Sequence, residues 1–234
     1  VFMPRYGKIN ERRHQLHEVI RLSGMNMIIN DSDHPLIIKV ASIPTARIQV
    51  YFIDNEEYFH RKAVLHDENG EFFEDNDERS MFFVKGVAET VKKLGWAPDI
   101  IHCHGWMTAL MPMYLRKVYH QDPHFSDAKL IYTDYEQEFD KLSPNLKQKI
   151  GFDGVDEADI DLITDPTFSN LNKLAVQYSD AVIHSSSNID PELASFINES
   201  GTPSLENKGG DAFVNDAGAF YEEVLEGKSI LVEE

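Results

Sequence analysis

Cysteine is almost absent from the 234-residue sequence, in which Cys103 is the single example. One thiol cannot form a disulfide within the chain, which excludes the small secreted domains that depend on disulfides. A reducing compartment suits this composition, and we therefore expect a cytoplasmic protein. No uninterrupted apolar run approaches the roughly 20 residues that a membrane helix needs, so we expect no membrane partner.

Basic side chains are also scarce, because 22 Lys and Arg residues stand against 40 Asp and Glu residues, for a formal net charge of −18. Nucleic acids and anionic membrane surfaces are bound by basic faces, so we expect neither as a partner. A neutral polysaccharide is not disfavoured by this charge. The hydrophobic fraction of 42% is that of an ordinary globular protein with a sizeable core.

Glycine-rich loops of the kind that hold phosphate groups are missing from the sequence as well. Its single Gly-Gly pair, Gly209-Gly210, lies near the carboxyl-terminal end between a lysine and an aspartate. Such a pair is typical of a surface turn. We therefore expect no bound cofactor.

What is present is a strand, a turn and a helix in residues 98–116, PDIIHCHGWMTALMPMYLR. Ile100 and Ile101 form a short apolar run that is typical of a buried parallel strand. His102 and His104 follow where this strand should end, with Trp106 just beyond them. Because ligands bind outside the carboxyl ends of the strands in open α/β sheets, these side chains are the first candidates for a functional site.

Strand and helix patterns alternate along the chain. A capping box from Asp75 to Glu78 should begin a helix that Gly95 ends. The pattern predicts an α/β fold with a doubly wound, largely parallel sheet, and an early β-hairpin. The expected strands are residues 36–40, 48–53, 100–101, 129–133 and 181–184, and the expected helices are 75–94, 108–116, 168–178, 191–198 and 212–225.

The segment around His102 resembles the H-x-H-D-W segment of the bacterial glycogen synthase and plant starch synthase family. The resemblance implies a Rossmann-like fold, that of the N-terminal half of a GT-B glycosyltransferase. It implies such a domain over residues 1–198, with residues 199–234 as a linker and a C-terminal helix that packs back on it. Further segments resemble the family in the same order: MPRYGKI at 3–9, VYFIDNEEYF at 50–59, DNDERSMFF at 75–83 and KLAVQYSDAVIHSS at 173–186.

The resemblance also implies an activity, the transfer of glucose from ADP-glucose to an α-1,4-glucan. In the family, the residue that matches His104 lies in the catalytic cleft, where it would donate a hydrogen bond to the transferred glucose. Packing inside the protein is the alternative for the aromatic candidates. The candidate substrate-binding residues are His102, Trp106, Thr108, Tyr6 and Tyr58.

Three departures from the family limit this reading. Gly105 stands where the family has an aspartate, and Thr133-Asp134-Tyr135 stands where it has histidine and asparagine. The family's K-T-G-G loop and donor-binding domain are not found in these residues. We therefore expect no turnover of ADP-glucose by the chain alone, and a protein partner would supply the donor domain.

Two alternatives remain open at this point. The chain could be a glucan-binding or protein-interaction module that derives from this family without transferring glucose. His102 and His104 could instead hold a metal ion, because two positions that are two apart on a strand share one face. A zinc site needs further ligands, and the remaining histidines show no matching spacing, so we expect no metal.

Overall fold

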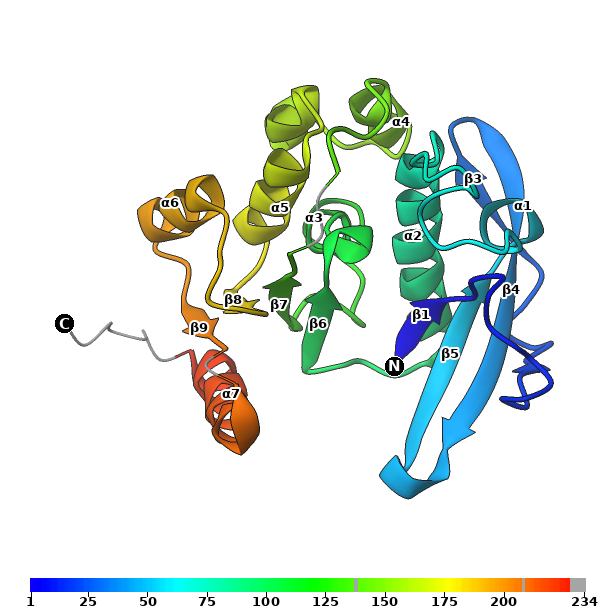
Figure 1. The fold of residues 1–234 in the computed structure, drawn as a ribbon, viewed down its shortest axis with the longest axis horizontal. Coiled ribbons are helices and arrows are strands. Elements are labelled where there is room, and N and C mark those ends of the chain that lie inside the picture. Colours follow the sequence, from blue (N-terminus) through cyan, green and yellow to red (C-terminus); the bar gives the residue numbers. More distant parts are fainter. Residues whose placement is uncertain (137–138, 208, 228–234) are drawn as a thin grey trace.

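The computed structural model describes residues 1–136, 139–207 and 209–227 and has an α/β architecture with two sheets (Figure 1). One sheet has the order β6-β7-β8-β9, and each neighbouring pair in it is parallel. The expected α/β class with a parallel sheet is therefore confirmed. The four strands are β6 (Ile100–His104), β7 (Lys129–Asp134), β8 (Ala181–His184) and β9 (Ser204–Glu206).

The strands before residue 55 form a second sheet of order β1-β5-β4-β2, to which β3 is added through β4. Its β1–β5 pair is parallel, whereas β4 pairs antiparallel with β5, β2 and β3. The long β4–β5 pair is the expected hairpin. The strands are β1 (Phe2–Pro4), β2 (His17–Glu18), β3 (Met25–Ile29), β4 (Ser32–Ile43) and β5 (Ile48–Asp54).

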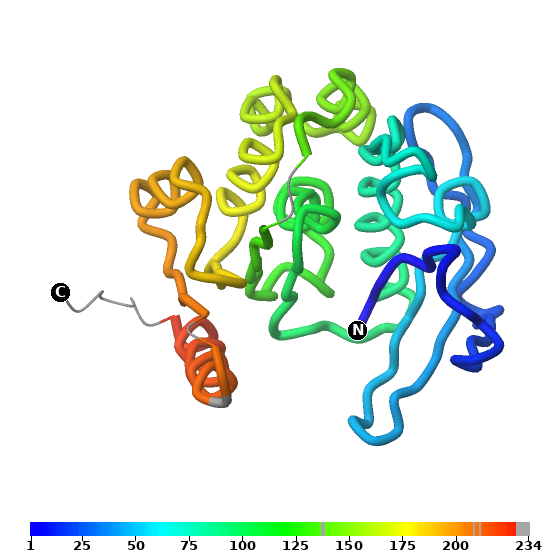
Figure 2. Tube along the Cα trace, in the orientation of Figure 1, coloured from blue at the N-terminus to red at the C-terminus, as the bar shows by residue number. Residues whose placement is uncertain are grey.

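Helices cover the two sheets, and the chain path can be followed in Figure 2. A large apolar core joins the helices α2, α3 and α5 to both sheets. The helices are α1 (Glu56–Phe59), α2 (Asn76–Leu94), α3 (Met111–Lys117), α4 (Leu146–Gly151), α5 (Phe168–Gln177), α6 (Pro191–Ser200) and α7 (Gly210–Glu226), with 3-10 turns at Pro44–Ala46, Trp106–Thr108 and Glu157–Thr164.

Helix α2 is the central helix of the molecule and begins and ends as the sequence predicts. Gly95 ends it in the left-handed conformation (φ 67°), with its N–H donating to the carbonyl groups of the last turn. The predicted capping box is wrong, because the Asp75 side chain makes no cap hydrogen bond. Its carboxylate instead accepts two hydrogen bonds from Arg61, one of them 2.6 Å long. Asp75 thus fixes the loop before the helix.

Residues after 198 contribute directly to the parallel sheet. Residues 204–206, expected within a linker, form β9 beside β8. The apolar face of α7 packs Phe220 and Val224 against Ile131 and Ile183 of the sheet. The expected helix near the C-terminus is confirmed, while the boundary between residues 198 and 199 stays a prediction. In the part of the chain that the structure describes, no helix is long and apolar enough to cross a membrane.

Gly7 lies at a close approach between the turn after β1 and the backbone after α1. A Cβ atom at Gly7 would lie 2.2 Å from the Arg61 carbonyl oxygen and 2.4 Å from that of His60. Neither backbone group can yield without moving the loop, so we expect Gly7→Ala to lower the free energy of unfolding by about 3 kcal/mol. Urea denaturation measures this loss. Gly218→Ala, in open space on α7, is the matched control and should be neutral or stabilising. Equal stabilities of the two variants would contradict the close approach.

Candidate functional site

The candidate site lies where β6, β7 and β8 end at the same edge of the parallel sheet. The register pairs His104 with Thr133, and Asp134 with His184. The final residues of three neighbouring strands therefore meet at one edge. This is the edge at which α/β sheets bind their ligands.

His102 is half-buried, and both of its ring nitrogens are engaged by other side chains. Its Nδ1 atom is 2.7 Å from the Tyr221 hydroxyl of α7, and its Nε2 atom is 2.6 Å from the Thr133 hydroxyl of β7. Burial, with a smaller effect of the neighbouring His104, lowers the pKa of His102 to about 3. The neutral His102 ring therefore ties α7 to the sheet. Because both of its nitrogens are engaged, neither is free to bind a ligand.

His104 is the exposed member of the pair. Its ring lies against that of His102, with a centroid distance of 3.9 Å and a tilt of 31° between the planes, and its Nδ1 atom is 3.1 Å from the Tyr135 hydroxyl. Partial burial lowers the pKa of His104, which favours the neutral ring. Its Nε2 atom has no hydrogen-bond partner among the described residues. This nitrogen is therefore available to a ligand.

A polar pocket of about 250 Å3 lies at the ends of β7 and β8 and is lined by Tyr135, the hydrogen-bond partner of His104. Asp134 lines it and is 3.2 Å from Nδ1 of the buried His184. The Ser186 hydroxyl donates to the Glu136 carboxylate at its rim. Carboxylates and hydroxyl groups beside Tyr135 form a surface suited to a polyhydroxylated ligand.

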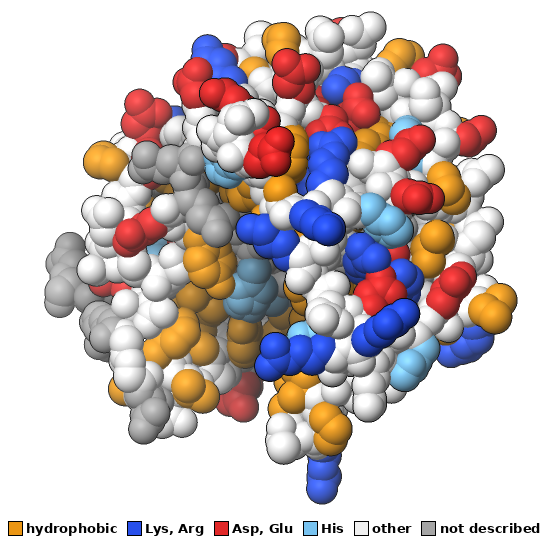
Figure 3. Space-filling view, turned by 45° about the vertical axis from the view of Figure 1, so that its right-hand side comes forward, with side chains coloured by type: hydrophobic (Ala, Val, Ile, Leu, Met, Phe, Trp, Pro, Cys, Tyr) orange, Lys and Arg blue, Asp and Glu red, His pale blue; other side chains and the backbone are white. Residues whose placement is uncertain are grey.

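An apolar groove of about 350 Å3 is lined by His104 and by residues of β6 and β1. In Figure 3 it is the hollow with hydrophobic side chains and a histidine in its floor. Thr108 lines this groove together with His102 and His104. The Thr108 hydroxyl donates to the Gly105 carbonyl over 2.8 Å, which closes the turn after β6.

The aromatic candidates lie mostly in the core. Trp106 is 2% exposed and packs against Phe72 and Phe139 at centroid distances of 5.8 and 4.9 Å. Tyr6 is half-buried, with its ring edge against Phe59. Burial raises the pKa of Tyr6 to about 12. Trp106 follows shortly after the end of β6, but its ring is buried and not exposed to a ligand as His104 is.

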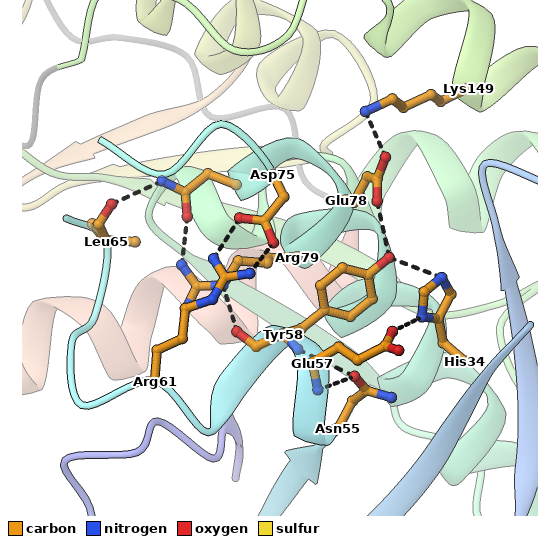
Figure 4. A network of polar contacts seen from close by, with 11 residues as sticks. His34, Asn55, Glu57, Tyr58, Arg61, Leu65, Asp75, Glu78, Arg79 and Lys149 are labelled. Atoms are coloured by element: carbon orange, nitrogen blue, oxygen red, sulfur yellow. Dashed lines mark hydrogen bonds and ion pairs between the residues drawn. The ribbon is translucent and has the colours of Figure 1, made fainter. Parts of the chain in front are cut away.

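Tyr58 is 3% exposed and belongs to a separate network of polar contacts around the start of α2 (Figure 4). Its hydroxyl donates to Glu78 over 3.0 Å and lies 3.1 Å from Nε2 of His34. Glu78 is in turn paired with Lys149 of α4. The structure thus brings His102, His104 and Thr108 together, but places Tyr58 elsewhere.

Gly105 adopts a backbone conformation that residues with a side chain rarely adopt, with φ 71° and ψ 171°. A Cβ atom there would also lie 3.4 Å from the Tyr135 ring. We therefore expect Gly105→Asp and Gly105→Ala each to lower the free energy of unfolding by about 1–3 kcal/mol. Thermal or urea denaturation tests this, with Gly151→Ala as a control without positive φ. A fully stable Gly105→Asp protein would contradict the assigned backbone conformation.

Sequence reasoning missed several members of this site. Tyr135 contacts His104, and His184 contacts Asp134. Tyr221 contacts His102. Tyr135 and His184 follow or end predicted strands, which was a usable signal. Nothing in the sequence pattern predicts that Tyr221 reaches His102 from a helix 119 residues away.

The histidine pair does not form part of a larger cluster of metal-binding side chains. Among the residues that the structure describes, no three His, Cys, Asp or Glu side chains are grouped so that they could hold a metal ion. The two rings lie against each other instead of converging on one point. The described geometry thus supports hydrogen bonding more than metal binding.

Comparison with known proteins gives consistent family matches. The family model described as the starch synthase catalytic domain matches residues 1–206. A glycogen synthase of Chlorobium limicola is 44% identical over 134 residues, which cover 57% of this chain and 27% of the relative. A glycogen synthase of Chlorobaculum parvum is 33% identical over 203 residues, which cover 83% of this chain and 40% of the relative.

A solved structure shares the fold. The catalytic domain of starch synthase IV from Arabidopsis thaliana, bound to ADP and acarbose, matches with a TM-score of 0.70 and 18% identity. The match covers 88% of this chain and 43% of that protein. The matches thus span less than half the length of these two glycogen synthases and of the starch synthase structure. Because the family model covers most of the sequence, the chain belongs to the starch synthase catalytic domain family.

Proposed function

We propose that the chain is the acceptor-side domain of a glucosyltransferase that moves glucose from ADP-glucose to the end of an α-1,4-glucan. The observation that carries the proposal is His104, whose exposed ring stands at the carboxyl edge of the parallel sheet. The Tyr135 hydroxyl engages Nδ1 of His104, and His104 is one of the residues that line the apolar groove. The family match over residues 1–206 and the acarbose-bound starch synthase IV structure support a sugar as the ligand.

In this proposal Tyr135 determines which ring nitrogen of His104 carries the proton. A Tyr135 hydroxyl that donates to Nδ1 leaves the proton of the neutral ring on Nε2, which then donates to a sugar hydroxyl. Thr108 and the acidic pocket beside Asp134 supply further polar groups within the same edge. The donor nucleotide and its diphosphate would be held by a domain or partner outside these residues. The negative charge on the leaving diphosphate needs cationic groups to stabilise it.

Binding of maltoheptaose to the chain tests the acceptor role. We expect a dissociation constant on the order of 1 mM. His104→Ala should weaken binding by about tenfold, the value of one good hydrogen bond, whereas His104→Gln keeps a donor and should lose less. Isothermal calorimetry or NMR titration gives both values. Failure of maltoheptaose to bind the folded chain at tens of millimolar would overturn the acceptor role.

Transfer of labelled glucose from ADP-glucose to maltoheptaose tests the reaction itself. We expect no transfer by the chain alone and measurable transfer when the donor-binding half of a relative, such as the Chlorobaculum parvum glycogen synthase, is added. Transfer that survives His104→Ala undiminished would remove this residue from the proposal.

A second function is favoured by the geometry of Gly105, which holds no carboxylate at the position of the family's aspartate. In that case the chain is a glucan-binding or protein-interaction module that transfers nothing. Maltoheptaose binding without transfer, even with an added donor half, would favour this module over the enzyme.

A further inference from the structure

Four aromatic rings stand in a row from α7 to the ends of the parallel strands. Tyr221 meets His102 edge to face, with a centroid distance of 5.7 Å and an angle of 74° between the planes. The centroid of the His102 ring lies 3.9 Å from that of His104, which in turn lies 6.2 Å from that of Tyr135. The exposed His104 ring is therefore in contact with His102, so the place of His102 limits the orientations that His104 can take.

The His102 ring is fixed by hydroxyl groups from two different elements. Its Nδ1 atom is 2.7 Å from the Tyr221 hydroxyl, and its Nε2 atom is 2.6 Å from the Thr133 hydroxyl. A neutral imidazole has one N–H donor and one acceptor nitrogen, so one hydroxyl accepts from the ring and the other donates to it. The χ2 torsion of histidine is soft, and a single hydrogen bond would let the ring pivot about that bond. The second hydroxyl, from Tyr221, is what fixes the ring plane.

His104 has fewer constraints of its own. Its Nδ1 atom is 3.1 Å from the hydroxyl of Tyr135, which is 41% exposed and follows the end of β7. No other hydrogen bond to this ring is present within residues 1–136, 139–207 and 209–227. The His102 ring is thus a second contact that orients His104. An unfixed His102 would leave His104 free to turn about its own χ2 torsion.

The Tyr221 hydroxyl is separable from the packing that docks α7. Phe220 and Val224 of this helix are buried against the apolar side chains of Ile131 and Ile183. These contacts need no hydrogen bond. Replacing Tyr221 by phenylalanine keeps a ring of nearly the same shape and removes only the hydroxyl, so α7 should stay in place.

We propose that Tyr221 is a positioning residue for sugar binding at His104. Its hydroxyl acts through the His102 ring and holds the His104 ring in the orientation in which Nε2 meets a sugar hydroxyl. Acceptor binding at the strand ends then depends on α7, whose Tyr221 lies 119 residues from His102 in the sequence. The inference rests on the proposed acceptor role of His104, and Tyr221 itself touches no sugar.

Maltoheptaose binding to the Tyr221→Phe chain tests this dependence. The dissociation constant should rise about fivefold, less than the roughly tenfold rise expected for His104→Ala. Because Tyr221 acts through His104, the double change Tyr221→Phe with His104→Ala should bind no more weakly than His104→Ala alone. A merely structural role would instead lower the affinity in both backgrounds. Isothermal calorimetry of all these proteins completes the double-mutant cycle.

Nitrogen NMR of the isotope-labelled histidine rings reads the positioning in the chain without sugar. In the wild type, His102 and His104 should each show one fixed tautomer, with the His104 proton on Nε2. In Tyr221→Phe the His104 ring nitrogens should shift toward the average of the two tautomers, because the ring leaves Tyr135 part of the time. Phe213→Leu is the matched control. It trims an apolar contact of α7 and keeps the Tyr221 hydroxyl, so it should retain the wild-type signals.

Three results would overturn the positioning role. The first is a Tyr221→Phe chain with the dissociation constant and the His104 signals of the wild type. The second is the same fold loss of affinity from Tyr221→Phe with and without His104. The third is an equal change of the His104 signals in Phe213→Leu, which would assign the effect to the docking of α7 in general. Failure of the wild type to bind maltoheptaose overturns the proposed function instead, and the NMR comparison still decides whether Tyr221 orders His104.

Discussion

Lys149→Met is expected to lower the free energy of unfolding by about 3–5 kcal/mol, because it removes the cation shared by two carboxylates at the start of α2. The Lys149 ammonium lies 2.6 Å from Asp77 and 2.7 Å from Glu78. Asp77 is fully buried, and its Oδ1 atom has no hydrogen-bond partner among the described residues. Without Lys149 this carboxylate is left buried and uncompensated.

The pH dependence of this loss follows from the direction of the pKa shift. Burial raises the pKa of Asp77 even with Lys149 present. Removing the cation raises it further, so the folded variant takes up a proton more readily than the unfolded chain. A raised carboxyl pKa makes the folded state gain stability as the pH falls. The deficit of Lys149→Met should therefore be larger at pH 8 than at pH 5.

Two comparisons separate the buried pair from a general effect of losing a lysine. Lys147 lies on the same helix and pairs with Asp161, whose side chain is 83% exposed, so Lys147→Met should cost less than 1 kcal/mol. The double change Asp77→Asn with Lys149→Met removes both charges and should recover most of the loss. Urea denaturation of the variants gives these values. A loss below 1 kcal/mol for Lys149→Met would contradict the buried pair.

The strands and helices of the parallel half could be predicted because their signals are local. Residues 100–101, 129–133 and 181–184 are short apolar runs, and the helix of residues 76–94 has both an apolar period and a glycine stop. The separation of the sheet into two could not be predicted in this way. Hydrophobic pattern identifies a strand but not its neighbours, and the edges of β1 and β6 are defined only by which strands pair.

The candidate site was likewise predictable only where its signals are local. His104 is a candidate because it ends a buried strand, and the carboxyl ends of neighbouring strands meet at one edge of a parallel sheet. Asp75 and Glu78 fit a capping box, yet in the structure Asp75 pairs with Arg61 and Glu78 pairs with Lys149. Trp106 and Tyr58 had the residue types of sugar-stacking side chains but lie in the core. Long-range partners of this kind are fixed by tertiary packing, which local spacing does not contain.

The second large effect is the loss of stability that His102 causes at acidic pH. We expect the free energy of unfolding to fall as the pH drops below about 6.5, and to fall more steeply than in His102→Gln. The folded pKa of His102 is about 3, whereas an unperturbed histidine titrates near 6.5. The unfolded chain therefore binds a proton that the folded chain excludes, which favours unfolding increasingly between these two values.

The size of this effect follows from about 1.4 kcal/mol per pH unit. At pH 4 His102 alone should lower the free energy of unfolding by about 3 kcal/mol. This loss adds to those from carboxylates, which the wild type and His102→Gln share. Urea denaturation at pH 7, 5 and 4 measures it as the difference between the wild type and His102→Gln. His120→Gln, at an exposed ring, is the control and should keep the wild-type dependence. Parallel curves for wild type and His102→Gln would show that His102 is not held neutral between Tyr221 and Thr133. The same result would weaken the assignment of α7 as a helix tied to the sheet through this ring, because an accessible imidazole would take up its proton in the folded state as well.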